Sequence, residues 1–158
     1  MVLSIKIAEK KLNLRDGLFN LDNIYKSLRG KLLSMGYIMV EKEQEYKTTQ
    51  YGEGVNFKFL YFKAFDDFAK VDSEVLFKFE NLKKIKGLHK GDLALTIKPA
   101  LTLDYKHRWG NNAFNKFFFN LYRKVFQDDL KKRYFGNVVR DTAEVYDYIK
   151  DLLDEYKH

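Results

Sequence analysis

Alternation of apolar and polar residues between Val55 and Tyr105 constrains the fold more than any other feature of the sequence. A period of two is typical of strands that bury one face. Short connections separate the alternating segments, which predicts an antiparallel sheet with one buried face. The clearest strands are expected at residues 55–62, 74–80 and 93–105, and further strands at residues 1–14 and 37–50.

The segment Leu21–Met35 has a helical period instead, with apolar residues spaced three and four apart. Asn20 or Asp22 is placed to cap its N-terminus. Gly36 follows the last apolar residue, where a left-handed C-cap would lie. The spacing therefore predicts an amphipathic helix with one buried stripe.

From Asn111 onward the apolar residues again follow a helical period. A break or kink is expected near Gly136–Asn137, and Asp141–Glu144 offers a capping pattern for a last helix. Residues 1–158 are therefore predicted to form a single α+β domain. Its antiparallel sheet of about five strands packs against an N-terminal helix and a long C-terminal helix with a kink.

Two residue pairs and one proline qualify this prediction. Asp16-Gly17 predicts a turn after the first strand, and Asp66-Asp67 a turn between two later strands. Asp66, Asp67 and Asp72 could alternatively offer oxygen ligands to a divalent cation, but the turn is the commoner role for Asp66 and Asp67. Pro99 interrupts the last predicted strand and cannot donate a ladder hydrogen bond, so we expect an edge position or a bulge there.

The composition excludes several classes of site. The chain of 158 residues has no Cys, which excludes disulfides, thiol catalysis and Cys-based metal centres. Its three His residues are scattered, and no run of apolar residues is long enough to span a membrane. The N-terminus places apolar residues before lysines, the reverse of a signal peptide. We expect a cytoplasmic protein without a cofactor or metal.

No phosphate-binding loop, dinucleotide fingerprint or hydrolase motif is present. The strongest catalytic candidate is a cluster of Asp104, His107, Arg108 and Trp109, in which a carboxylate could pair with an imidazole. The alternative is a strand end with solvated polar residues. That alternative is the commoner arrangement, so we predict that the chain is not an enzyme.

A formal net charge of +7 favours an anionic partner. Lysine supplies most of it, with 23 Lys against 6 Arg, although Arg is preferred for bidentate phosphate recognition. RNA is the partner expected first, although charge alone does not distinguish RNA from DNA or an anionic membrane, and the alternative is an ordinary solvated surface. The candidate phosphate contacts form one group in a loop (Lys83, Lys84, Lys86, Lys90) and one along a helix (Lys116, Arg123, Lys131, Lys132, Arg133).

The order β-α-β-β-β-β-α-α resembles that of the helix-grip (START and Bet v1-like) superfamily. The resemblance lies in element order and not in a residue motif. It implies an apolar small molecule or lipid held between the sheet and the C-terminal helix. Aromatic bulk at these positions also fits a filled core. The residues implied as walls of that cavity are Phe57, Phe59, Phe77, Phe79, Phe114 and Phe118.

The second face of the predicted sheet carries Leu60, Phe62 and Leu76 among charged residues. Exposed apolar side chains in such a setting are typical of a modest protein contact. A homodimer is therefore a further predicted partner, and a homo-oligomeric scaffold is a third alternative for the function.

Overall fold

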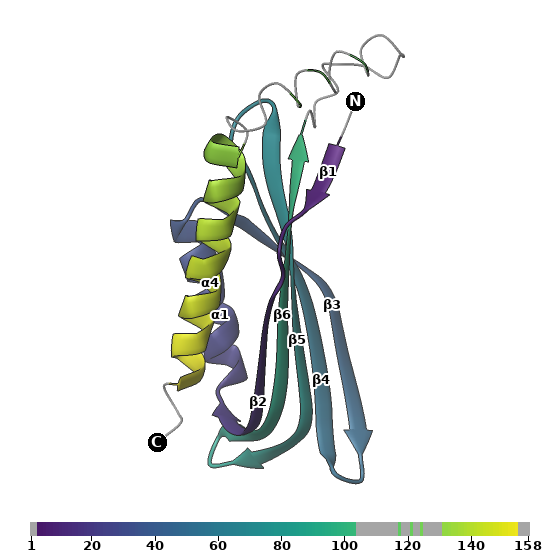
Figure 1. Ribbon diagram of the computed structural model, residues 1–158. Helices are drawn as coiled ribbons and strands as arrows, with labels where there is room; N and C mark the ends of the chain where they lie inside the picture. Colours follow the sequence, from purple (N-terminus) through teal and green to yellow (C-terminus); the bar gives the residue numbers. More distant parts are fainter. Residues whose placement is uncertain (1–2, 104–116, 118–120, 122–123, 125–130, 155–158) are drawn as a thin grey trace.

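Figure 1 shows the computed structural model, which describes residues 3–103, 117, 121, 124 and 131–154. A six-stranded antiparallel sheet carries α1 and α4 on one face, so the predicted α+β class is confirmed. The strands are β1 (Leu3–Lys6), β2 (Lys10–Phe19), β3 (Ile38–Thr49), β4 (Gly52–Ala64), β5 (Ala69–Ile85) and β6 (Leu88–Leu103). The helical elements are α1 (Leu21–Ser34), a π-helical turn η1 (Lys131–Phe135) and α4 (Gly136–Asp154).

The strands lie in the order β1-β6-β5-β4-β3, and β2 also pairs with β6. The predicted meander of four consecutive strands is therefore confirmed from β3 to β6. The first predicted strand is divided into β1 and β2, which pair with successive parts of β6. This division accounts for one more strand than expected.

Pro99 lies in β6, which is an interior strand, so the predicted edge position is wrong. The Pro99 carbonyl accepts a hydrogen bond of 3.0 Å from the Ile7 amide, in the gap between β1 and β2. In a strand, the N and O atoms of one residue point to the same side. The side of Pro99 that lacks an N–H therefore faces the break between β1 and β2. An uninterrupted partner strand would have required a donor at this position, and the break removes that requirement.

The core lies between the inner face of the sheet and the two helices. Alternate residues of β5 and β6 are buried, as the period of two predicts. The apolar stripe of α1, formed by Ile24, Leu28 and Leu32, is buried against this face. The stripe of α4 is buried beside it, with Val138, Val145, Ile149 and Leu153. The two helices run antiparallel, side by side (Figure 1).

The caps of α1 agree with the sequence. The side chain of Asn20 accepts a hydrogen bond of 3.1 Å from the Asn23 amide, which satisfies one of the free donors at the N-terminus. Met35 ends the helix, and Gly36 follows it with φ of 87°. Glycine adopts this left-handed conformation without a steric cost, so the predicted C-terminal signal is confirmed.

The turn predicted at Asp16-Gly17 is wrong, because β2 continues through it as an irregularity of the β2–β6 ladder. Asp16 has φ of 52°, and its amide donates a hydrogen bond of 3.0 Å to the Asp92 carboxylate. Asp tolerates the left-handed region. Here the residue pair makes a bulge and the strand continues.

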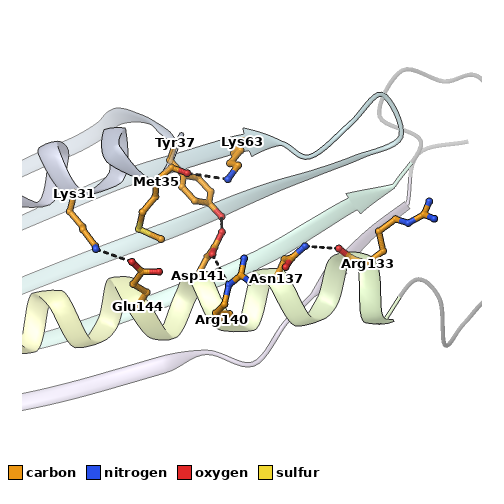
Figure 2. Close-up of polar contacts among 9 residues, drawn as sticks. All are labelled: Lys31, Met35, Tyr37, Lys63, Arg133, Asn137, Arg140, Asp141 and Glu144. Atoms are coloured by element: carbon orange, nitrogen blue, oxygen red, sulfur yellow. Dashed lines mark hydrogen bonds and ion pairs between the residues drawn. The ribbon is translucent and has the colours of Figure 1, made fainter.

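Figure 2 shows how α4 is fixed to the rest of the fold. The buried Tyr37 hydroxyl donates a hydrogen bond of 2.6 Å to the Asp141 carboxylate, which is also buried. On the surface, Lys31 of α1 donates to Glu144 at 2.8 Å. The capping role predicted for Asp141–Glu144 is therefore wrong. The helix already begins at Gly136, so Asp141 lies inside it. Its carboxylate accepts the hydrogen bond from Tyr37, the residue that precedes β3.

The irregularity predicted near Gly136 takes the form of η1, which ends where α4 begins. Phe117, Leu121 and Lys124 are helical, as predicted for this segment. The rest of the helix predicted from Asn111, together with Asp104, His107, Arg108 and Trp109, falls outside the described residues.

Neither α1 nor α4 covers the outer face of the sheet. Lys58 and Glu74 form an ion pair of 2.9 Å there. Because α1 packs on the inner face, it does not cover this surface as a sheet-capping helix would. The homodimer expected from this face stays a prediction. The apolar side chains exposed or half-exposed on this face are Ile38, Val40, Leu60, Phe62 and Leu76.

Candidate functional site

A cavity of about 560 Å³ lies between the first turns of α1 and the inner face of the sheet. Its walls come from β3, β4, β5, the start of β6 and α1. In Figure 1 this is the end of the molecule at which the β3–β4 and β5–β6 hairpins turn. The volume is within the range of small-molecule pockets.

Four phenylalanines form the floor of this cavity. Phe57 and Phe77 face each other in the register of β4 and β5, and Phe59 and Phe79 follow two residues later on each strand. Phe57–Phe59 and Phe77–Phe79 are stacked pairs, each with ring centroids 6.1 Å apart. Edge-on contacts, with centroids 6.0 Å apart for Phe59–Phe77 and 6.3 Å apart for Phe57–Phe79, connect the two stacked pairs. We call these four residues the Phe quartet.

Three rings of the Phe quartet are buried, and the fourth is partly exposed to the cavity. Phe59, Phe77 and Phe79 are at most 3% exposed, whereas Phe57 is half-buried. Tyr25 of α1 packs against Phe59 at 5.6 Å, and Tyr46 of β3 meets Phe57 at 6.5 Å. An apolar molecule that enters would therefore contact Phe57, Tyr25 and Tyr46 first.

Polar side chains surround the opening. Asp22 lies in the first turn of α1, Glu41 lies opposite Phe59 in the β3–β4 register, and Glu53 is near the start of β4. Lys84 and His89, which face each other across the β5–β6 ladder, are the other ionisable polar residues of the lining apart from the tyrosines. We call these five residues the rim.

The structure brings together four of the six predicted ligand residues, namely the Phe quartet. Phe114 and Phe118 lie outside the described residues. The resemblance placed the ligand against the C-terminal helix, but within the described residues the walls come from the sheet and α1. The sequence did not single out Tyr25 or Glu41 for the site, because Tyr25 is one of the apolar residues at helical spacing in Leu21–Met35 and Glu41 lies at a bulge. A bulge at Lys42 separates Glu41 from the alternation of the later β3 residues, so parity did not place it.

The candidate phosphate contacts are divided between two ends of the molecule. Arg133 lies next to Tyr134, whose hydroxyl donates to Asp66 in the β4–β5 turn at 2.7 Å. The loop lysines are at the opposite end of β5, whose 17 residues span about 55 Å. One compact partner would not reach both ends. Lys116 and Arg123, and the side chains of Lys131 and Lys132, fall outside the described residues.

The loop that carries Lys83, Lys84, Lys86 and Lys90 is a tight hairpin. Ile85 pairs with Leu88, and Lys86 and Gly87 both have positive φ, which suits a two-residue turn. All four lysines are exposed. In the register Lys83 lies directly opposite Lys90, an arrangement of like charges that costs stability.

Asp66 has the turn role predicted for it. Its carboxylate accepts hydrogen bonds of 2.8 Å from the amides of Phe68 and Ala69. Within the described residues, no group of His, Asp and Glu is arranged to hold a metal ion.

Among the helices described, none is both long enough and apolar enough to cross a bilayer.

Comparisons of the chain with protein-family models, curated proteins and solved structures find no significant match. The features that bear on function are therefore the cavity and the β5–β6 hairpin.

Proposed function

We propose that the chain is a non-enzymatic binding protein that holds an apolar small molecule in the cavity above the Phe quartet. The observation that supports this is the combination of about 560 Å³ of space with an aromatic floor that is open on one side. Pockets of this size are typical of small-molecule sites, and this one combines aromatic side chains with a polar rim. The helix-grip resemblance implies the same class of ligand.

The expected affinity is moderate. Burying about 300 Å² of apolar ligand surface is worth about 7 kcal/mol before the cost of association. After the cost of association is subtracted, dissociation constants between about 10 μM and a few millimolar follow from this figure. A neutral fluorescent probe such as N-phenyl-1-naphthylamine is suitable for detecting such binding.

Leu21→Trp tests the location of the site. Leu21 lines the cavity, so an indole there should obstruct the opening and weaken probe binding at least tenfold. Leu33→Trp is the matched control, because Leu33 is on the same helix, 56% exposed and outside the cavity. No fluorescence increase with the wild-type chain, or equal loss in both variants, would overturn the proposal.

We infer a second candidate function, contact with RNA, from the β5–β6 hairpin. Four exposed lysines crowd a tight turn, and Lys83 opposes Lys90 without an ion pair in the described part of the chain. An anionic partner would relieve this repulsion, and phosphates would be held without sequence readout.

The hairpin is tested with a labelled single-stranded RNA in a salt titration. Changing Lys83, Lys86 and Lys90 to Gln should weaken binding and reduce the slope of log K against log salt by about 2. The same change at the exposed Lys26, Lys42 and Lys150 is the control. Equal effects of the two triple variants would remove the hairpin from the proposal, and so would binding of anionic vesicles in place of RNA.

A further inference from the structure

The rim carries an excess of negative charge, although the whole chain has a net charge of +7. Asp22, Glu41 and Glu53 contribute three carboxylates, and Lys84 contributes one ammonium group. The three carboxylates are exposed, and none forms an ion pair with another described residue. Their charge is therefore available to a molecule at the opening.

The carboxylates approach the opening from separate elements. Asp22 comes from α1, Glu41 from the inner face of β3, and Glu53 from β4. Just inside, Tyr25, Tyr46 and Phe57 present aromatic rings. Aromatic faces attract cations through their quadrupole, and carboxylates attract them by charge. The carboxylates and the aromatic rings therefore both favour a positively charged ligand.

Two features favour an anion, and both are offset. The first feature is the positive partial charge at the N-terminus of α1. The Asn20 side chain already accepts a hydrogen bond from the Asn23 amide there, and the Asp22 carboxylate offsets the partial charge. Lys84 is the one hairpin lysine in the lining, against three carboxylates, whereas Lys83 and Lys90 pair on the opposite face of the sheet. The charge of the lining is therefore negative.

We propose that the ligand is an organic cation, with an apolar body on the Phe quartet and an ammonium group at one of the carboxylates of the rim. These carboxylates are spread along the opening, because Glu41 lies opposite Phe59 and Glu53 precedes Phe59 by six residues on β4, or about 20 Å along the strand. This inference rests on the proposed function, because it assigns the charge of the molecule that the cavity takes.

Three probes with the same ten-carbon chain separate the two proposals: decyltrimethylammonium, decanol and decyl sulfate. They are titrated calorimetrically, with the two ionic probes below their micellar concentrations and decanol below its solubility limit. We expect the cation to bind about tenfold more tightly than decanol, and the sulfate most weakly. If decanol or decyl sulfate binds as tightly as the cation, the charge assignment fails and the apolar site stands. If none of the three binds, the proposed function fails as well.

Glu41→Gln with Glu53→Gln tests the residues. This double variant should weaken decyltrimethylammonium binding about tenfold and leave decanol binding unchanged. Glu43→Gln with Glu45→Gln is the matched control, because these residues face the other side of the sheet from Glu41 on the same strand. The control should change neither affinity. Equal losses for cation and decanol, or equal losses in both double variants, would overturn the assignment.

Discussion

At the scale of single residues, the contact between Tyr37 and Asp141 is the most consequential one in the described structure. The two residues are 104 positions apart in the sequence, and both are buried. Burial, together with the hydrogen bond to Asp141, raises the pKa of Tyr37 well above its usual value, so the hydroxyl remains a donor. Loss of either partner would leave a buried polar group without its hydrogen bond.

Tyr37→Phe is expected to lower the free energy of unfolding by about 2 kcal/mol. Asp141→Asn keeps an acceptor for the Tyr37 hydroxyl but loses the negative charge, and should lower this free energy by about 1 kcal/mol. Asp147→Asn on an exposed position of the same helix should change it by less than about 0.5 kcal/mol. Urea unfolding followed by circular dichroism measures all three. A cost for Tyr37→Phe as small as that of the surface control would show that the contact contributes nothing to stability.

Asp66 gives the fold a dependence on pH. Partial burial alone would raise the pKa of Asp66, but hydrogen bonds from Tyr134, Ala69 and Phe68 outweigh it and hold this pKa below its usual value. Burial and the bond to Asp66 raise the pKa of Tyr134 to about 12, so its hydroxyl remains a donor in acid.

Because the pKa of Asp66 is lower in the folded chain than in the unfolded one, the unfolded chain binds more protons as the pH falls below about 4. The stabilisation is therefore complete at neutral pH and disappears as the pH falls through the folded pKa. We expect Asp66→Asn to lower the melting temperature at pH 7 and to match the wild-type chain near pH 2. A melting-temperature difference that is constant across this range would contradict the expectation.

At the scale of elements, the sequence determines strands and helices where one face is uniformly apolar. The alternation in β4, β5 and β6 and the stripe of α1 led directly to the observed elements, and the Phe quartet followed from the same parity. The errors at Asp16, Pro99 and Asp141 have a common cause. Each residue has a local preference that a partner distant in sequence redirects: Asp92, the break between β1 and β2, and Tyr37. The rim was not predicted as a group, because its residues come from separate elements and the bulge at Lys42 removes Glu41 from the alternation of the later β3 residues.

Two glycines in regular elements are expected to respond in opposite ways to alanine. A Cβ at Gly91 in β6 would lie 2.7 Å from the Glu80 carbonyl oxygen at the irregularity of β5, so Gly91→Ala should destabilise by about 1–3 kcal/mol. A Cβ at Gly30 in α1 meets nothing within 4 Å, and Gly30→Ala should stabilise by about 1 kcal/mol. Chemical denaturation measures both, and the same sign for the two would contradict this account.

At the scale of the whole molecule, the polar contacts that fix α4 and the cavity lie in different parts of one sheet. Asp141 is separated from the cavity by Tyr37 and by Tyr61, whose rings pack 5.1 Å apart, and Tyr61 is in turn two residues from Phe59 on β4, or about 7 Å along the strand. Changes at sites separated by more than about 10 Å, with no shared partner, are usually additive. Stability and ligand binding should therefore be separable in this chain.

Asp141→Asn with decyltrimethylammonium tests this separation. The variant should melt at a lower temperature than the wild-type chain, yet its dissociation constant for the ligand should agree within about twofold. A ligand that binds only the folded state adds RT ln(1 + [L]/Kd) to stability, which is about 2.7 kcal/mol at a hundredfold excess over Kd. The two chains should therefore gain the same free energy of unfolding from the same excess of ligand. A smaller gain in the variant would mean that the position of α4 controls the cavity, and that the two parts of the sheet are coupled.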